Sequence, residues 1–233
     1  MGIYAQPIFR LAGDRGLLVE YGDSIDPVIN DRVRVVALAI KQNALPGVKE
    51  CLTAYSSLTV VYDPDITNPH LLKQQFINLQ ENISPRDIPE PAVASIPVCY
   101  GGDYGPDIEY VAQFNGLTSG EVIRIHSEPC YRIYMLGFTP GFPYLGGLPS
   151  QIHTPRLATS RTLVPAGSVG IANSQTGIYS LDSPGGWQLI GRTPLKLFSP
   201  HRKNPVLLES FDHLKFFPIS PHDFQAMAQE EER

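Results

Sequence analysis

Three arginines stand in or beside a stretch of the chain that is rich in glycine, proline and aromatic residues. Arg156, Arg161 and Arg192 each carry a guanidinium, which can hold a carboxylate through two parallel hydrogen bonds. For each arginine alone a surface salt bridge is an equal explanation, so the hypothesis rests on the whole constellation. The predicted ligand-binding residues are Arg156, Arg161, Ser168, Gln175, Thr176, Ser183, Gly185, Gly186, Trp187 and Arg192, and the predicted pocket wall is Phe138, Phe142 and Tyr144.

Residues 137–149 and 183–187 contain more glycine, proline and aromatic side chains than ordinary connections need. Glycine permits backbone conformations closed to other residues, proline removes flexibility, and aromatic rings supply apolar walls with little entropy to lose on binding. Loops held on a rigid scaffold commonly carry binding function. We therefore predict a shaped binding surface here, the alternative being a set of tight turns that only join strands.

One histidine is the best candidate for proton transfer. His126 precedes Ser127 and Glu128 at the end of a predicted helix, and histidine is the side chain whose proton exchanges most readily near neutral pH. The alternative is structural, because a histidine in the last helical turn also interacts favourably with the helix dipole. His126 is predicted to be the catalytic general acid or base.

Other catalytic patterns find less support in the sequence. Residues 166–170 approach a nucleophile elbow around Ser168, but extended residues follow where the elbow needs a helix, so Ser168 is expected to line a pocket instead. The glycine-rich segments 146–147 and 183–186 lack the lysine and helix start of a phosphate loop. The histidines and cysteines show no metal-ligand spacing, and no metal site is predicted.

The composition is that of a soluble globular protein, with 42% hydrophobic and 18% charged residues. The formal net charge is −5 and the basic residues form no long stripe, which disfavours nucleic-acid binding. No apolar run approaches the roughly 20 residues that span a bilayer, and the first ten residues lack the pattern of a secretory signal. Three widely spaced cysteines suit reduced thiols, so a cytoplasmic location is expected.

The first part of the chain predicts a mixed sheet-and-helix domain. Apolar residues recur with helical spacing in two segments, and extended runs of hydrophobic residues surround them. The order is strand, helix, strand, strand, helix, strand, the split β-α-β (ferredoxin-like) arrangement. The predicted strands are 16–21, 48–54, 57–62 and 93–99, and the predicted helices are 25–41 and 69–79.

Residues 84–92 contain three prolines, a stiff polar connection that could not continue a helix. We therefore predict an N-terminal α+β domain over residues 1–88 and a C-terminal domain over 89–233. In the second domain, two short helices precede short strands whose turns are dense enough for a closed barrel. The predicted helices are 107–114 and 119–126, and the predicted strands are 131–137, 167–172, 177–181, 187–192, 206–208 and 213–218.

Four segments carry a resemblance to a known family. They are Tyr131-Arg-Ile-Tyr-Met-Leu-Gly-Phe-Thr-Pro-Gly-Phe-Pro-Tyr-Leu145, Val164-Pro-Ala-Gly-Ser-Val-Gly-Ile-Ala172, Gln175-Thr-Gly-Ile-Tyr179 and Ser183-Pro-Gly-Gly-Trp-Gln-Leu-Ile-Gly-Arg-Thr-Pro194. In this order they resemble the KipI/PxpB family, which includes the B subunit of 5-oxoprolinase, the KipI inhibitor of a sporulation histidine kinase, and chains formerly labelled as the first subunit of allophanate hydrolase. The match is dense over residues 96–198. Similarity to the carboxyltransferase half of urea carboxylase explains the older label.

The resemblance implies a cyclophilin-like barrel and the role of the B subunit in a prokaryotic ATP-dependent 5-oxoprolinase. The expected partners are a KipA-like (PxpC) subunit and a LamB/YcsF-type (PxpA) subunit, with which the chain would open 5-oxoproline to glutamate; alone it is expected to be inactive. The complex would use ATP at a site that the sequence does not locate. 5-Oxoproline is a small anionic acid with a ring amide, which suits the arginines, the side chains of Gln175 and Thr176, and the rings of Tyr144 and Trp187.

The resemblance also leaves a function of another class open. A KipI-like regulator would inhibit the autophosphorylation of a sensor histidine kinase by docking its barrel on the kinase. In that case Phe138, Phe142 and Tyr144 would form an interaction surface. A peptidyl-prolyl isomerase rests on barrel analogy alone, and a fold does not by itself imply a function.

Overall fold

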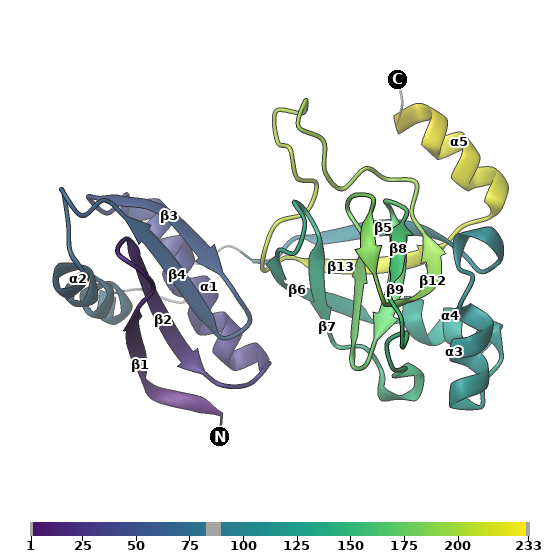
Figure 1. Cartoon of the computed structure of the whole chain (residues 1–233), viewed down its shortest axis with the longest axis horizontal. Coiled ribbons are helices and arrows are strands. Elements are labelled where there is room, and N and C mark those ends of the chain that lie inside the picture. Colours follow the sequence, from purple (N-terminus) through teal and green to yellow (C-terminus); the bar gives the residue numbers. More distant parts are fainter. Residues whose placement is uncertain (1, 83–89, 232–233) are drawn as a thin grey trace. The chain divides into compact units, whose positions relative to one another are not determined.

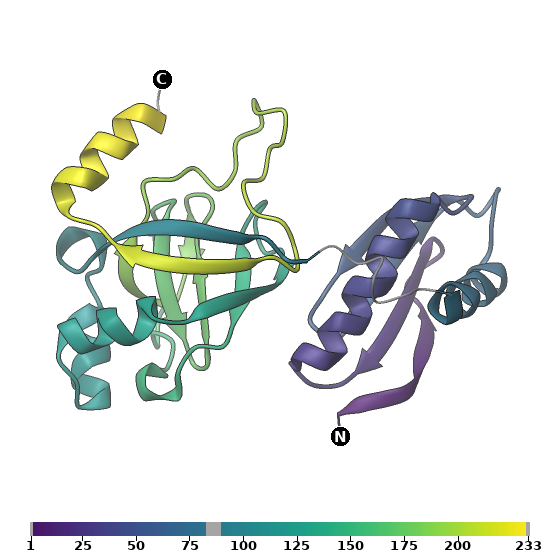
Figure 2. The same cartoon turned by 180° about the vertical axis from the view of Figure 1, so that it is seen from behind.

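The computed structural model describes residues 2–82 and 90–231. By their internal contacts the residues fall into two compact units, Met1–Glu90 and Pro91–Arg233. The predicted domain boundary after residue 88, and most of the proline-rich connection around it, lie outside the described residues. Figures 1 and 2 show the first unit as an open sheet with helices and the second as a barrel with helices.

The first unit is built on a four-stranded sheet in the order β1-β2-β4-β3, in which every neighbouring pair is antiparallel. The long helix α1 crosses one face of this sheet (Figures 1 and 2). Its buried residues include Ile29, Val33, Val36 and Ile40, the helical apolar spacing seen in the sequence. The elements are β1 (Ile3–Leu11), β2 (Gly16–Gly22), α1 (Pro27–Asn43), β3 (Val48–Thr53), β4 (Ser57–Tyr62) and α2 (Pro69–Asn82).

The predicted sixth element of this unit is wrong. β5 (Val93–Tyr100) belongs to the second unit, where it pairs with β12 (Gln188–Arg192) and β13 (His213–Pro218). The fourth strand of the first sheet is instead β1, which the sequence analysis missed because most of its side chains are exposed at a sheet edge and give no clear alternation. The ferredoxin-like assignment is therefore not confirmed.

The second unit contains a closed seven-stranded barrel, which agrees with the density of strands and turns in the sequence. Around the barrel the strands follow the order β10-β7-β6-β13-β5-β12-β9, and only β5 and β13 run parallel. The further strands are β6 (Cys130–Leu136), β7 (Pro143–Gly146), β9 (Ser168–Ala172) and β10 (Gln175–Ile178). A separate two-stranded ribbon joins β8 (Arg161–Val164) to β11 (Ser183–Gly185).

Two helices pack on the barrel core. α3 (Ile108–Asn115) and α4 (Ser119–Ser127) lie beside each other at one side of the barrel (Figures 1 and 2). Thr118 and Glu121 form a reciprocal capping box at the start of α4, which satisfies backbone N–H groups that a helix start leaves open. Val111, Val122 and Ile125 bury their side chains against barrel residues. The barrel is therefore a packed scaffold, and its loops are free to form a site.

Candidate functional site

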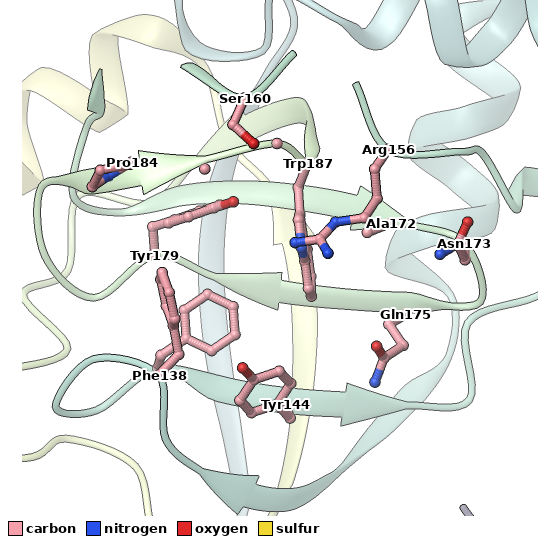
Figure 3. Close-up of a pocket in the computed structure, with 13 residues that line it drawn as sticks. Phe138, Tyr144, Arg156, Ser160, Ala172, Asn173, Gln175, Tyr179, Pro184 and Trp187 are labelled. Atoms are coloured by element: carbon pink, nitrogen blue, oxygen red, sulfur yellow. The ribbon is translucent and has the colours of Figure 1, made fainter. Parts of the chain in front are cut away.

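A pocket of about 340 Å³ opens on the barrel where four separate segments meet (Figure 3). The turn between β6 and β7, the hairpin between β9 and β10, the β11 strand with the residues that follow it, and the segment before β8 each contribute to it. The pocket is lined by Phe138, Phe142, Tyr144, Arg156, Ser160, Ala172, Asn173, Gln175, Tyr179, Pro184, Gly185, Gly186 and Trp187.

The walls of the pocket are aromatic, and Phe142 stands at their centre. Its ring contacts Tyr144 at 4.9 Å between centroids, Tyr179 at 5.5 Å and Trp187 at 5.6 Å, the last two edge to face. Phe138 completes the group with an edge-to-face contact at 5.5 Å. Such pairs stabilise one another and leave rigid apolar surfaces. The predicted wall residues therefore do lie together, with Trp187 and Tyr179 added to them.

Arg156 is the cation of this pocket. Its guanidinium forms no hydrogen bond or ion pair with any residue that the structure describes, and Figure 3 shows it reaching toward Trp187. The backbone on both sides is fixed: Gln188 Nε2 donates to the Pro155 carbonyl at 2.9 Å, and Leu157 N donates to the Gly186 carbonyl at 2.8 Å. The backbone that carries Arg156 is thus held in place, while the hydrogen-bond donors of its side chain stay open for a ligand.

Two tyrosine hydroxyls border the same space. Burial raises the pKa of both Tyr144 and Tyr179, and the positive charge of Arg156 opposes this only partly. Both phenols therefore keep their protons at neutral pH and act as neutral hydrogen-bond donors. The oxygen of Tyr179 also accepts a hydrogen bond from the backbone N–H of Trp187.

Two residues of the pocket have a backbone conformation that side chains other than glycine rarely adopt. Phe138 has a φ of 62° and Asn173 a φ of 53°, both in the left-handed region. Asparagine tolerates this region, whereas phenylalanine does so at a cost. Phe138 is also 63% exposed. Strained residues of this kind concentrate at ligand sites, which is a second reason to place the site here.

Arg161 lies next to the pocket but is already engaged. Its Nη2 donates to Asp107 Oδ1 at 2.7 Å and Oδ2 at 2.9 Å, and its Nη1 donates to the carbonyl of Trp187 at 3.2 Å. Asp107 Oδ2 also accepts from the backbone N–H of Leu189 at 2.6 Å. The pair therefore fixes the backbone at Trp187 and Leu189, which supports a positioning role for Arg161 in place of the predicted ligand contact.

Replacing Arg161 with glutamine should lower the free energy of unfolding of the barrel by about 1 to 2 kcal/mol, because the bonds to Asp107 and Trp187 are partly buried. Trp187 is the only tryptophan of the chain, so its fluorescence reports on this unit directly. We expect the variant to unfold at lower denaturant and its indole to be more accessible to acrylamide. Arg124→Gln, which breaks an exposed helical pair with Glu128, is the control. If the two variants unfold at the same denaturant concentration and acrylamide quenches their indole fluorescence equally, the positioning role of Arg161 is contradicted.

The structure places four other predicted ligand residues outside the pocket lining. Arg192 donates through Nε to the Ala166 carbonyl at 2.8 Å, and Ser168 is buried on β9. The Thr176 hydroxyl is buried and donates to the Gly170 carbonyl at 3.0 Å. Ser183 Oγ is buried with no hydrogen-bond partner among the described residues. Their predicted contacts with a ligand stay predictions, whereas Gln175, Gly185, Gly186 and Trp187 do line the pocket.

His126 is enclosed in the barrel core, away from the pocket-lining residues. Its ring is fully buried and stacks on Phe216 at 4.6 Å between centroids. Its Nδ1 lies 2.8 Å from the Tyr100 hydroxyl and its Nε2 lies 2.9 Å from Thr176 Oγ1. Because Thr176 gives its own proton to a carbonyl, it accepts from Nε2–H, so Nδ1 accepts from Tyr100.

This chain of hydrogen bonds satisfies the neutral imidazole completely. Burial lowers the pKa of His126 to about 3, so the ring is uncharged at neutral pH. A general acid or base near pH 7 needs a pKa near that pH and contact with the substrate. The structure therefore supports a structural role for His126 in place of the predicted proton transfer. The helix-dipole alternative also gives way, since that role requires a charged ring.

Sequence reasoning missed several members of the site. Tyr179 stands at the end of a segment that carries the family resemblance, and its type alone offered both a ring and a donor. No sequence pattern marked Asn173, because its left-handed backbone conformation follows from its place in the hairpin between β9 and β10. Asp107 stands at the N-cap position of α3, where a carboxylate is expected to bind its own helix, but it binds Arg161 and Leu189 instead. No local pattern marks that distant pairing.

No helix in the described parts of the chain combines the length and hydropathy needed to cross a bilayer. Among the same residues, no cluster of three or more histidine, cysteine, aspartate or glutamate side chains is arranged to hold a metal ion.

Comparison with known proteins points to one family. Residues 7–208 match the family described as the carboxyltransferase domain, subdomain C and D. The chain is 43% identical to the B subunit of 5-oxoprolinase from Bacillus subtilis over 94% of its own length and 95% of that protein. It is 42% identical to the Escherichia coli protein of the same name, over 89% and 94% of the two chains. The crystal structure of TTHA0988 aligns with a TM-score of 0.81 at 35% identity, covering 88% of this chain and 40% of that one.

Proposed function

Because the chain belongs to the carboxyltransferase domain, subdomain C and D family, and within it to the proteins named as the B subunit of 5-oxoprolinase, we propose that its barrel pocket binds 5-oxoproline. The observation that carries this proposal is the Arg156 guanidinium in an aromatic pocket, for which the described residues supply no hydrogen-bond or ion-pair partner. A guanidinium pairs with a carboxylate through two parallel hydrogen bonds, and the bond is stronger where aromatic walls exclude water.

The remaining walls suit the rest of this ligand. Its five-membered ring is flat and largely apolar, so it fits between the rings of Trp187 and Tyr144. The side chain of Gln175 lines the pocket and can both donate to and accept from a ring amide. The pocket volume of about 340 Å³ is at the lower end for ligand sites, which suits a small acid.

The reaction in this proposal is hydrolysis of the lactam. Water attacks the ring carbonyl carbon and the C–N bond breaks, which gives the amine and the second carboxylate of glutamate. The carbonyl oxygen gains negative charge on the way, so hydrogen-bond donors held around it lower the barrier. The amide is unreactive, and we propose that the complex drives the step with ATP, with this chain inactive alone.

The partners in this proposal follow from the family. A protein named as a B subunit works beside other subunits, and the match to TTHA0988 leaves the larger part of that chain for further domains. We propose that the partners are a KipA-like subunit and a LamB/YcsF-type subunit, in the cytoplasm where ATP is supplied. The cyclophilin-like description of the barrel belongs to the same proposal. The kinase-inhibitor alternative is not favoured, because the relatives that match most of the chain are named for the enzyme.

The test has two arms. In the first, calorimetry measures binding of 5-oxoproline to the purified chain, with Trp187 fluorescence as a second signal. In the second, ATP-dependent glutamate release is measured with this chain alone and with its two partner subunits. We expect saturable binding alone and activity only in the mixture. No activity in a well-folded mixture that contains all three subunits would refute the enzyme role and favour a kinase-inhibition assay.

A further inference from the structure

The pocket holds a second open donor besides Arg156, the hydroxyl of Tyr179. This oxygen accepts from the backbone N–H of Trp187, but the described residues offer no acceptor for its own proton. A phenol hydroxyl that is buried without an acceptor loses a hydrogen bond that water would supply. The residue is 2% exposed and lines the pocket, so water in the pocket of the free protein, or a ligand that displaces this water, supplies the missing acceptor.

The chain around Tyr179 holds this hydroxyl in one place. The ring packs edge to face against Phe142 and against Trp187, the latter at 6.3 Å between centroids. A side-chain carbon at position 185 would come within 2.3 Å of the hydroxyl oxygen, so only glycine fits there. Figure 3 shows the hydroxyl end of the ring directed toward Trp187. The donor is therefore pre-organised and has little entropy to lose when a ligand binds.

The two donors differ in charge, so each of them suits a different group of the ligand. Arg156 is a cation and prefers the carboxylate. Tyr179 remains neutral, and a neutral hydroxyl pairs well with a carbonyl oxygen without the cost of removing an ion from water. Arg156 is close enough to Tyr179 for its charge to favour the ionised phenol, so both groups serve the same space.

We propose that Tyr179 is the residue that recognises the lactam, by donating its hydroxyl proton in a hydrogen bond to the ring carbonyl oxygen while Arg156 holds the carboxylate. This inference rests on the proposed binding of 5-oxoproline. A buried donor of this kind discriminates strongly, because an acid that lacks the carbonyl leaves the hydroxyl unpaired. The same bond strengthens as the carbonyl oxygen gains charge during ring opening.

The test compares two ring acids, 5-oxoproline and cyclopentanecarboxylate, which share a carboxylate and differ in the lactam. Calorimetry gives the dissociation constant of each for the wild-type chain, Tyr179→Phe and Arg156→Gln. We expect Tyr179→Phe to weaken binding of 5-oxoproline about tenfold and to change that of cyclopentanecarboxylate less than about twofold. Arg156→Gln should weaken both acids to a similar extent.

Two further variants sharpen the comparison. Tyr131→Phe removes a buried hydroxyl that donates to the His126 carbonyl elsewhere in the same barrel. In this variant, the ratio of the affinity for 5-oxoproline to that for cyclopentanecarboxylate should stay at the wild-type value. Gly185→Ala keeps the Tyr179 hydroxyl but displaces it, so the ratio should fall as in Tyr179→Phe. An unchanged ratio in Tyr179→Phe, with 5-oxoproline still bound by the wild type, overturns this inference alone. Absence of binding in the wild type overturns the proposed function and this inference with it.

Discussion

Replacing Arg156 with glutamine should reduce the affinity for 5-oxoproline at least about 100-fold. The substitution removes two charge-assisted hydrogen bonds to the carboxylate, each worth roughly 1.5 to 3 kcal/mol, and every 1.4 kcal/mol is a factor of ten. The fold should be unaffected, because the guanidinium has no partner among the described residues. Calorimetric titration measures the affinity, and the assembled complex should show a matching loss in ATP-dependent glutamate release at low substrate.

The design of this experiment separates charge from geometry. Arg156→Lys keeps the charge but loses the planar fork, so it should recover only part of the affinity. Arg124→Gln removes an arginine that is paired with Glu128 on the surface of α4, and it should bind as the wild type does. If Arg156→Gln binds 5-oxoproline within about threefold of the wild type, the carboxylate is not held by this residue.

The barrel should lose stability as the pH falls from about 6.5 toward 3, because His126 stays uncharged in the folded state over this range. Burial lowers its pKa to about 3 from 6.5. Below pH 6.5 the unfolded chain binds a proton that the folded chain does not, so the stability present above that pH is lost on acidification. A pKa lowered this far corresponds to roughly 4 to 5 kcal/mol over the whole range, of which about 3 kcal/mol falls between pH 7 and 4.

A variant without the imidazole isolates this contribution from that of the carboxylates. His126→Gln is expected to be less stable than the wild type at pH 7, and the difference should shrink by about 3 kcal/mol by pH 4. Denaturant unfolding followed by Trp187 fluorescence reports on the barrel at each pH. His222→Gln, at a side chain that is 92% exposed, should follow the wild type throughout. A difference that stays constant across this range would show that His126 does not remain neutral in the fold.

The local pattern of the chain was enough to predict most elements of both units. The helical spacing of Ile29, Val33 and Val36 predicted α1, and the extended run near residue 60 became β4. Such patterns work because each element must bury one face against its neighbours. They failed for β5, since a strand carries no local mark of which sheet it will join, and pairing with β12 and β13 was decided by contacts across about a hundred residues of sequence.

The roles of the polar residues were decided by the tertiary structure. From the sequence, Arg156 and Arg161 were equivalent cations, and only folding gave Arg161 the partner Asp107 and left Arg156 open to the pocket. In the same way His126 offered an exchangeable proton until the barrel enclosed it between Tyr100 and Thr176. The charge and hydrogen-bonding capacity of a side chain are fixed by its type, but its pKa and its availability depend on burial and partners.

The sequence by itself thus determined the family, the dense aromatic and glycine stretch, and the wall residues Phe138, Phe142 and Tyr144 that line the pocket. Only the tertiary structure brought Tyr179 and Asn173 to that same space, distinguished Arg156 from the other predicted arginines, and left Arg156 and the Tyr179 hydroxyl without a protein acceptor among the described residues. The physical reason is that composition and spacing follow from local chemistry. A binding site instead follows from which groups remain unsatisfied after the rest of the chain has paired.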